Sequence, residues 1–325
     1  MSHVTRHIGY WVLMGFYGLL AYYTLLGAYE VLPLLVIPML GIFVSGGLAS
    51  IYVLKREVLG GQMTVLFSKT QQLNALGAFM GAWSTYLLNV YIGLGAVLAS
   101  CFIGIIAALY FKKVQVPVYC GAFLGMSSMV LLPLQAFAVA SILVAIVFLL
   151  TKDVFNGYGG KLGTIAFSAA LITAWLFSYS APGIQINTML EALLVIIFAM
   201  IGAGLTFAMN HRLNAGPVLS SAVVGFFLGA ILLFFPHVFG EVLALVVVGA
   251  SYVGMCGANR FSDERGIIVA GLFFGLIYIF SAPYLGGAGG KLGTTAFISG
   301  LSVKGLFTLS VQLQHRLVSQ KHRRV

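Results

Sequence analysis

The chain has 325 residues, of which 61% are hydrophobic and 7% charged, and its formal net charge is +10. An ordinary soluble domain is about 45–50% apolar and about 25% charged, so a soluble fold could not bury this much apolar surface. These values predict an all-α integral membrane protein whose first partner is the lipid bilayer. The basic residues are spread between apolar segments and along the C-terminus, a pattern typical of cytoplasmic loops and not of a nucleic-acid-binding surface.

Twelve apolar segments follow one another along the chain, and each is a candidate to cross the roughly 30 Å hydrocarbon layer. The fifth is short, so eleven spans plus a re-entrant segment are an alternative. The segments cover approximately residues 8–29, 33–54, 72–89, 92–111, 116–132, 134–151, 161–180, 189–210, 215–235, 241–258, 266–282 and 291–312.

Basic residues mark cytoplasmic loops and so test this count. With the N-terminus inside, the outer loops carry three glutamates and a single basic residue, Lys291. The sequence therefore predicts a multi-pass protein of a cell membrane with both termini cytoplasmic, and its short loops favour a bacterial inner membrane. The inner loops and tail hold Lys55, Arg56, Lys112, Lys113, Lys152, Arg212, Arg260, Arg265, Arg316, Lys321, Arg323 and Arg324.

Part of the sequence occurs twice. The residue numbers of three matches differ by 130, 129 and 121, and the matches follow in the same order, which indicates one duplicated unit. The matches pair GGKLGT at 159–164 with GGKLGT at 289–294, FLGM at 123–126 with YVGM at 252–255, and Gly81, Ala82, Thr85 and Asn89 with Gly202, Ala203, Thr206 and Asn210.

The duplicated unit contains five predicted spans. Because five is odd, the second copy must enter the membrane from the opposite side, as in the inverted repeats of transporters. We predict two N-terminal helices in residues 1–57, at the periphery or in an oligomer contact, and a first repeat in 70–182. The second, inverted repeat occupies 187–312, and a basic cytoplasmic tail occupies 313–325.

Each GGKLGT stands at the start of an apolar helix. Glycines allow close backbone approach, and a helix start carries unpaired N–H groups and partial positive charge, so a lysine and a threonine there predict an anion-binding constellation. The alternative is that Lys161 only anchors the chain and the glycines only turn it. Helix length places the two starts near opposite mouths of one pathway. The residues are Gly159, Gly160, Lys161, Thr164, Gly289, Gly290, Lys291 and Thr294.

Four further residues are candidates to contact a solute. Lys304 stands well inside the twelfth span, where an ionisable group is a functional candidate unless it reaches back to the membrane surface. Ser127, Ser128 and Cys256 lie beside the second match, where small residues serve either close helix packing or a solute passage.

Enzymatic and cofactor chemistry have little basis in the sequence. The cysteines show no pairing or metal-ligand spacing, and His237 with Glu241 supplies too few ligands for a metal. There is no Walker or HExxH motif, so we predict no enzyme and no cofactor. No acidic residue falls in the middle of a span, which favours a channel or uniporter over a proton-driven pump.

These features predict a permease, either a channel or a secondary transporter, that passes a small anionic or polar solute along the axis of the repeat. The five-plus-five layout resembles that of urea channels and, more loosely, of ammonium channels, and this resemblance of layout implies a channel for a neutral solute as the alternative. A membrane enzyme or scaffold without transport activity is the third hypothesis.

Overall fold

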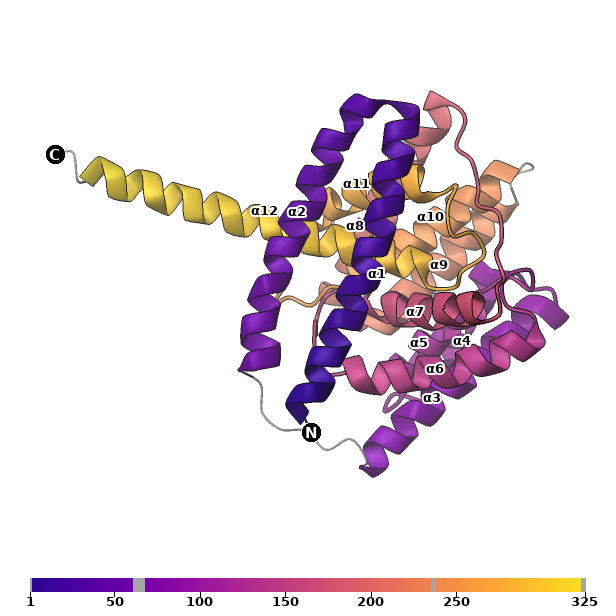
Figure 1. Cartoon of the computed structure of the whole chain (residues 1–325). Coiled ribbons are helices and arrows are strands. Elements are labelled where there is room, and N and C mark those ends of the chain that lie inside the picture. The colour runs from indigo at the N-terminus through magenta and orange to yellow at the C-terminus, as the bar shows by residue number, and fades with distance from the viewer. Residues whose placement is uncertain (1, 61–67, 235–237, 323–325) are drawn as a thin grey trace.

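The computed structural model describes residues 2–60, 68–234 and 238–322, with side chains from residue 4 to residue 312 except that of Val238 (Figure 1). The described residues form helices and turns, with twelve α-helices in the places where the sequence predicts spans. They are α1 Ser2–Val31, α2 Val36–Val53, α3 Lys69–Tyr86, α4 Ala96–Tyr110, α5 Gln115–Gly125, α6 Leu134–Thr151, α7 Lys161–Leu176, α8 Met189–His211, α9 Pro217–Leu233, α10 Val238–Gly254, α11 Glu264–Ser281 and α12 Lys291–His322.

Six of the described helices are long and apolar enough to cross a membrane, namely α1, α2, α6, α8, α11 and α12. Helices α4, α7, α9 and α10 are apolar but shorter. Helix α5 has 11 residues and, at about 1.5 Å per residue, reaches only about half of the hydrocarbon thickness. The predicted fifth span, 116–132, is therefore helical only in its first part.

Helices α1 and α2 form a peripheral pair (Figure 1). Helix α1 contacts α6, α7, α11 and α12, while α2 packs mainly on α12. The last turns of α12 extend away from the other helices, as Figure 1 shows.

The remaining ten helices pack in two similar groups, the first from α3 to α7 and the second from α8 to α12. Helix α3 packs on α5 and α6, and helix α8 packs on α10 and α11. Glycines permit these contacts: a Cβ on Gly125 would lie 2.6 Å from Cβ of Thr85, and a Cβ on Gly254 would lie 2.6 Å from Cβ of Thr206. The groups meet where α4 packs on α9 and where α7 packs on α12.

Helices α7 and α12 touch near their first turns, through two glycines. A Cβ on Gly293 would lie 2.5 Å from the Cα of Gly163, and a Cβ on Gly163 would overlap Gly293 in the same way. Only residues without a side chain allow this backbone approach. The expectation that the two helix starts lie apart, near opposite mouths, is therefore wrong.

We expect Gly163→Ala and Gly293→Ala each to lower the free energy of unfolding by about 1–3 kcal/mol, the usual cost of overpacking. The measurement is thermal unfolding in detergent. Gly47→Ala is the control, because a Cβ at this position in α2 meets no atom within 4 Å. Equal stability of the Gly163→Ala and Gly47→Ala proteins would show that the crossing is not tightly packed.

Candidate functional site

The glycine loop before α12, residues 285–290, binds residues that follow α5, and the glycine loop before α7, residues 155–160, binds residues that follow α10. Gly289 N–H donates to Ser127 Oγ at 3.0 Å, and Gly159 N–H donates to Cys256 Sγ at 3.1 Å. Two backbone bonds, both 2.9 Å long, run beside them, from Ser128 N–H to the Gly287 carbonyl and from Gly257 N–H to the Gly157 carbonyl. Ser127, Ser128 and Cys256 thus hold the two glycine loops in place.

The two glycines that precede the lysines have left-handed backbones, with φ of 81° at Gly160 and 88° at Gly290. A side chain on either residue would also overlap the helix of the other group. The hydroxyls of Thr164 and Thr294 turn back to the carbonyls of Gly160 and Gly290, at 3.4 and 3.3 Å. These hydroxyls therefore close the first helical turn.

Lys291 is buried, and its ammonium group lies at the C-terminal end of α11. Nζ donates to the carbonyl of Ser281 at 2.7 Å and to those of Ala282 and Tyr284. The last carbonyls of a helix have no partner within it and carry partial negative charge. Lys291 donates to the carbonyls at this end, which offsets the cost of burying its charge.

Lys161 makes the corresponding contact in the first group. Its buried Nζ donates to the carbonyl of Lys152, which follows the last residue of α6, at 3.2 Å, and to Asn156 Oδ1 at 3.0 Å. The helix starts cross at their glycines, but the two ammonium groups bind the ends of different helices. Both lysines are thus bonded by the protein itself.

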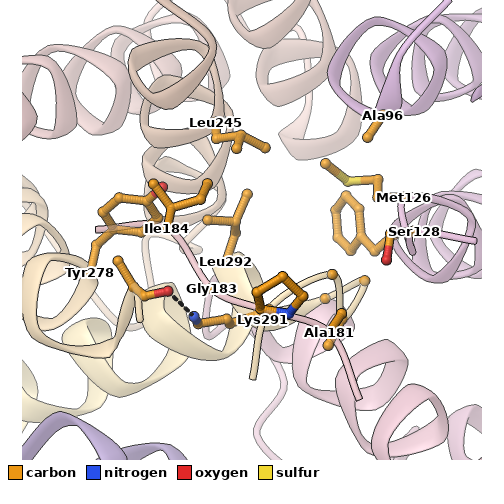
Figure 2. A pocket seen from close by; sticks show the side chains of 18 of the residues that line it. Ala96, Met126, Ser128, Ala181, Gly183, Ile184, Leu245, Tyr278, Lys291 and Leu292 are labelled. Atoms are coloured by element: carbon orange, nitrogen blue, oxygen red, sulfur yellow. Dashed lines mark hydrogen bonds between the residues drawn. The ribbon is translucent and has the colours of Figure 1, made fainter. Parts of the chain in front are cut away.

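A cavity of about 410 Å³ lies beside Lys291 (Figure 2). Figure 2 shows Leu245, Ile184, Tyr278 and Leu292 toward one side of it and Met126 and Ser128 toward the other, with the Lys291 ammonium bonded to a carbonyl of the wall. The lining is mostly apolar. It consists of Ala96, Phe123, Met126, Ser128, Val130, Ala181, Pro182, Gly183, Ile184, Leu245, Tyr252, Tyr278, Ala282 and Gly286 to Leu292.

A second cavity, of about 380 Å³, lies beside Lys161. It is built mainly from the first group's glycine loop, with Met255, Pro217 and Val218 from the second group. Its remaining lining residues are Gln71, Asn74, Val116, Phe123, Phe148 and Lys152, Asp153 and Asn156 to Leu162.

Phe123 lines both cavities. The ring packs on that of Tyr252 with 4.3 Å between centroids, and Tyr119 lies 4.4 Å from Phe123 in the same way. The Tyr252 hydroxyl points to Met126 Sδ at 3.7 Å. Buried aromatic rings thus surround the residue that the two cavities share.

Lys304 lies apart from both cavities. Its half-buried ammonium group donates to the carbonyl of Arg260 at 3.0 Å, and the residue lines a groove between α2 and α12. The structure therefore does not bring Lys304 together with Lys161 and Lys291.

Phe123, Tyr252 and Met126 were not predicted from the sequence as site residues. They belong to the second match, FLGM with YVGM, beside the small residues that were predicted. The signal was present, because an aromatic ring and a methionine occur at equivalent places in both copies. His237 lies outside the described residues, which contain no group of three metal-ligating side chains.

We expect Lys291→Met to lower the free energy of unfolding by about 1–3 kcal/mol, because it removes the charged donor that the carbonyls of Ser281, Ala282 and Tyr284 share. Thermal unfolding in detergent measures this. Lys113→Met, on an exposed loop, is the control and should change little. If both proteins unfold at the wild-type temperature, the contacts of Lys291 do not stabilise α11.

The resemblance of layout to urea and ammonium channels rests on the sequence pattern, and comparisons of the chain with protein families, curated proteins and solved structures find no match.

Proposed function

We propose that the protein is a permease of a cell membrane that passes a small solute between the two cavities, past the rings of Phe123 and Tyr252. The observation that carries this proposal is the arrangement of the cavities. Each contains one GGKLGT lysine and one methionine of the second match, and they share Phe123. In transporters with a duplicated unit, the solute site likewise lies between the two copies.

Equivalent contacts in the two groups support an inverted repeat. Positions that differ by 129 or 130 residues make the same bonds, such as Gly159 to Cys256 beside Gly289 to Ser127. The unusual φ values also recur, at 56° for Phe155 and 53° for Leu285. A unit of five helices followed by a similar unit of five gives the two copies opposite orientations, and hence twelve membrane segments with α1 and α2.

The distribution of charge indicates which end of the pathway faces the cytoplasm. The cavity beside Lys161 is lined by Lys152 and Asp153, next to the basic loops that the positive-inside rule assigns to the cytoplasm. It is the inner cavity in this proposal, and the cavity beside Lys291 is the outer one. Both termini then lie in the cytoplasm.

Broken helices support transport over a purely structural role. Helix α5 ends at Gly125, and residues 126–133 continue without an α-helix past Ser128 and Val130, which line the outer cavity. Non-helical backbone at membrane depth is tolerated where it is buried in protein or lines a cavity. Discontinuous helices of this kind form the solute sites of transporters.

The cavity linings favour a small neutral solute. The outer wall is largely apolar, and both ammonium groups are bonded to carbonyl or amide oxygens. A specific observation also favours an anion, namely that each cavity contains exactly one buried lysine. To bind an anion, Lys161 or Lys291 would exchange a carbonyl partner for the solute.

We expect reconstituted protein to conduct a small neutral solute such as urea into liposomes. Phe123→Ala should increase this flux by about tenfold, the change for a barrier lowered by about 1.4 kcal/mol. The matched control is Phe137→Ala, which removes an equally buried ring that lines neither cavity. Equal urea flux through the two variants would show that the solute does not pass Phe123.

The same liposomes distinguish the solute classes. Loss of chloride or nitrate flux in Lys161→Gln and Lys291→Gln proteins, with folding retained, supports the anion. Intact urea flux and no anion flux in the wild type support the neutral solute. If no solute crosses through wild-type protein, the permease proposal fails and a membrane enzyme or scaffold takes its place.

A further inference from the structure

A groove of about 520 Å³ runs between α2 and α12 and shares Tyr158 with the cavity beside Lys161. The two helices meet at small residues: Ser45 Oγ donates to the Ser302 carbonyl at 3.0 Å, and Gly305 lies against the Ser45 backbone. Larger side chains line the groove. Among them are Leu48, Ile51, Lys55, Arg56, Arg260 and Lys304.

Four basic side chains line this groove, namely Lys55, Arg56, Arg260 and Lys304. Among the described residues, one carboxylate forms an ion pair with them. Arg260 forms an ion pair with Glu57, donates to the Asn156 carbonyl and lies over the Tyr158 ring at 4.4 Å. Its partners fix the guanidinium at one end of the groove.

The other three cations keep their charge available. Lys304 donates to a backbone carbonyl and Arg56 to the Tyr52 hydroxyl at 3.1 Å, and both partners are uncharged. Lys55 is exposed, and no described carboxylate forms an ion pair with any of the three. The groove therefore attracts an anion with several acceptor oxygens.

Apolar side chains adjoin these cations. Leu48 and Ile51 on α2 are 44% and 45% exposed, and both helices are long and apolar enough to cross a membrane. In a bilayer such residues face acyl chains, while the basic residues lie toward the headgroups. A groove with both features fits an amphiphile better than a free ion.

We propose that this groove binds the phosphate headgroup of an anionic phospholipid through Lys55, Arg56 and Lys304, with acyl chains along Leu48 and Ile51. The site also gives a role to Lys304, which the proposed solute pathway does not use. It does not depend on the transported solute.

The test is native mass spectrometry of the full-length protein titrated with phosphatidylglycerol, phosphatidylcholine or inorganic phosphate. Wild-type protein should bind phosphatidylglycerol more tightly than phosphatidylcholine. Each cation near an anionic lipid contributes about fivefold in affinity, so Lys55→Gln should weaken binding about fivefold and the Lys55→Gln/Lys304→Gln double variant about thirtyfold. Because Lys55 is exposed, the Lys55→Gln protein should fold normally, and its weaker binding can be measured even if the double variant does not fold.

The matched control is Lys112→Gln/Lys113→Gln, which removes two exposed cations from another loop and should bind phosphatidylglycerol as the wild type does. Equal weakening by this control would reduce the effect to net charge and overturn the site. Unchanged affinity in the double variant would also overturn it. So would inorganic phosphate that displaces the lipid with equal affinity, since the groove would then hold a free anion.

Discussion

The contact between Gly163 and Gly293 is the constraint on which the rest of the structure depends. Because neither residue has a side chain, the first turns of α7 and α12 approach each other to backbone contact. The loop before each helix then reaches the end of α5 or α10 in the other group, where Ser127 and Cys256 bind it. Because each loop reaches into the other group, each of the two cavities has walls from both groups.

The lysines gain their positions from the same crossing. Each follows a glycine in the left-handed conformation and points back to the end of the helix before its loop. A buried ammonium group is costly alone, but the carbonyls of a helix end are matching partners. Each lysine ammonium group therefore connects two consecutive helices, α6 with α7 or α11 with α12, before it can bind a solute.

The peripheral helices contact both lysine loops. At one end of the pair, Tyr284 donates to Glu30 of α1, and the Tyr284 carbonyl accepts from Lys291. At the other end, Glu57 binds Arg260, which donates to the carbonyl of Asn156, a partner of Lys161. Helix α1 and the residues that follow α2 are therefore joined to the loops beside both cavities.

The sequence predicted the helices well, because apolar runs bounded by charge, proline or glycine determine where helices form in lipid. It placed the sixth segment at 134–151, as observed, and the starts of α7 and α12 at Lys161 and Lys291. It did not predict the early end of α5 at Gly125. There Ser127 and Ser128 bond to the loop of the other group, a long-range contact that competes with continuing the helix.

The candidate site was less predictable. Length and charge place a lysine relative to the membrane, but its partners depend on where the preceding helix ends in space. The helix-length argument put the two starts at opposite mouths because it treated each helix as crossing alone, whereas the glycines bring them together. Phe123 and Tyr252 meet only through packing of the two groups, which no local pattern specifies.

Thiol accessibility in membrane vesicles distinguishes opposite from equal orientations of the two groups. Met129 and Ala258 are exposed and differ by 129 residues, as the second match does. The native cysteines are buried, so single cysteines at these two places can be labelled with a membrane-impermeant maleimide in vesicles of either orientation. Opposite orientations predict labelling of Met129→Cys only from outside and of Ala258→Cys only from the cytoplasmic side. Labelling of both from the same side would rule out opposite orientations.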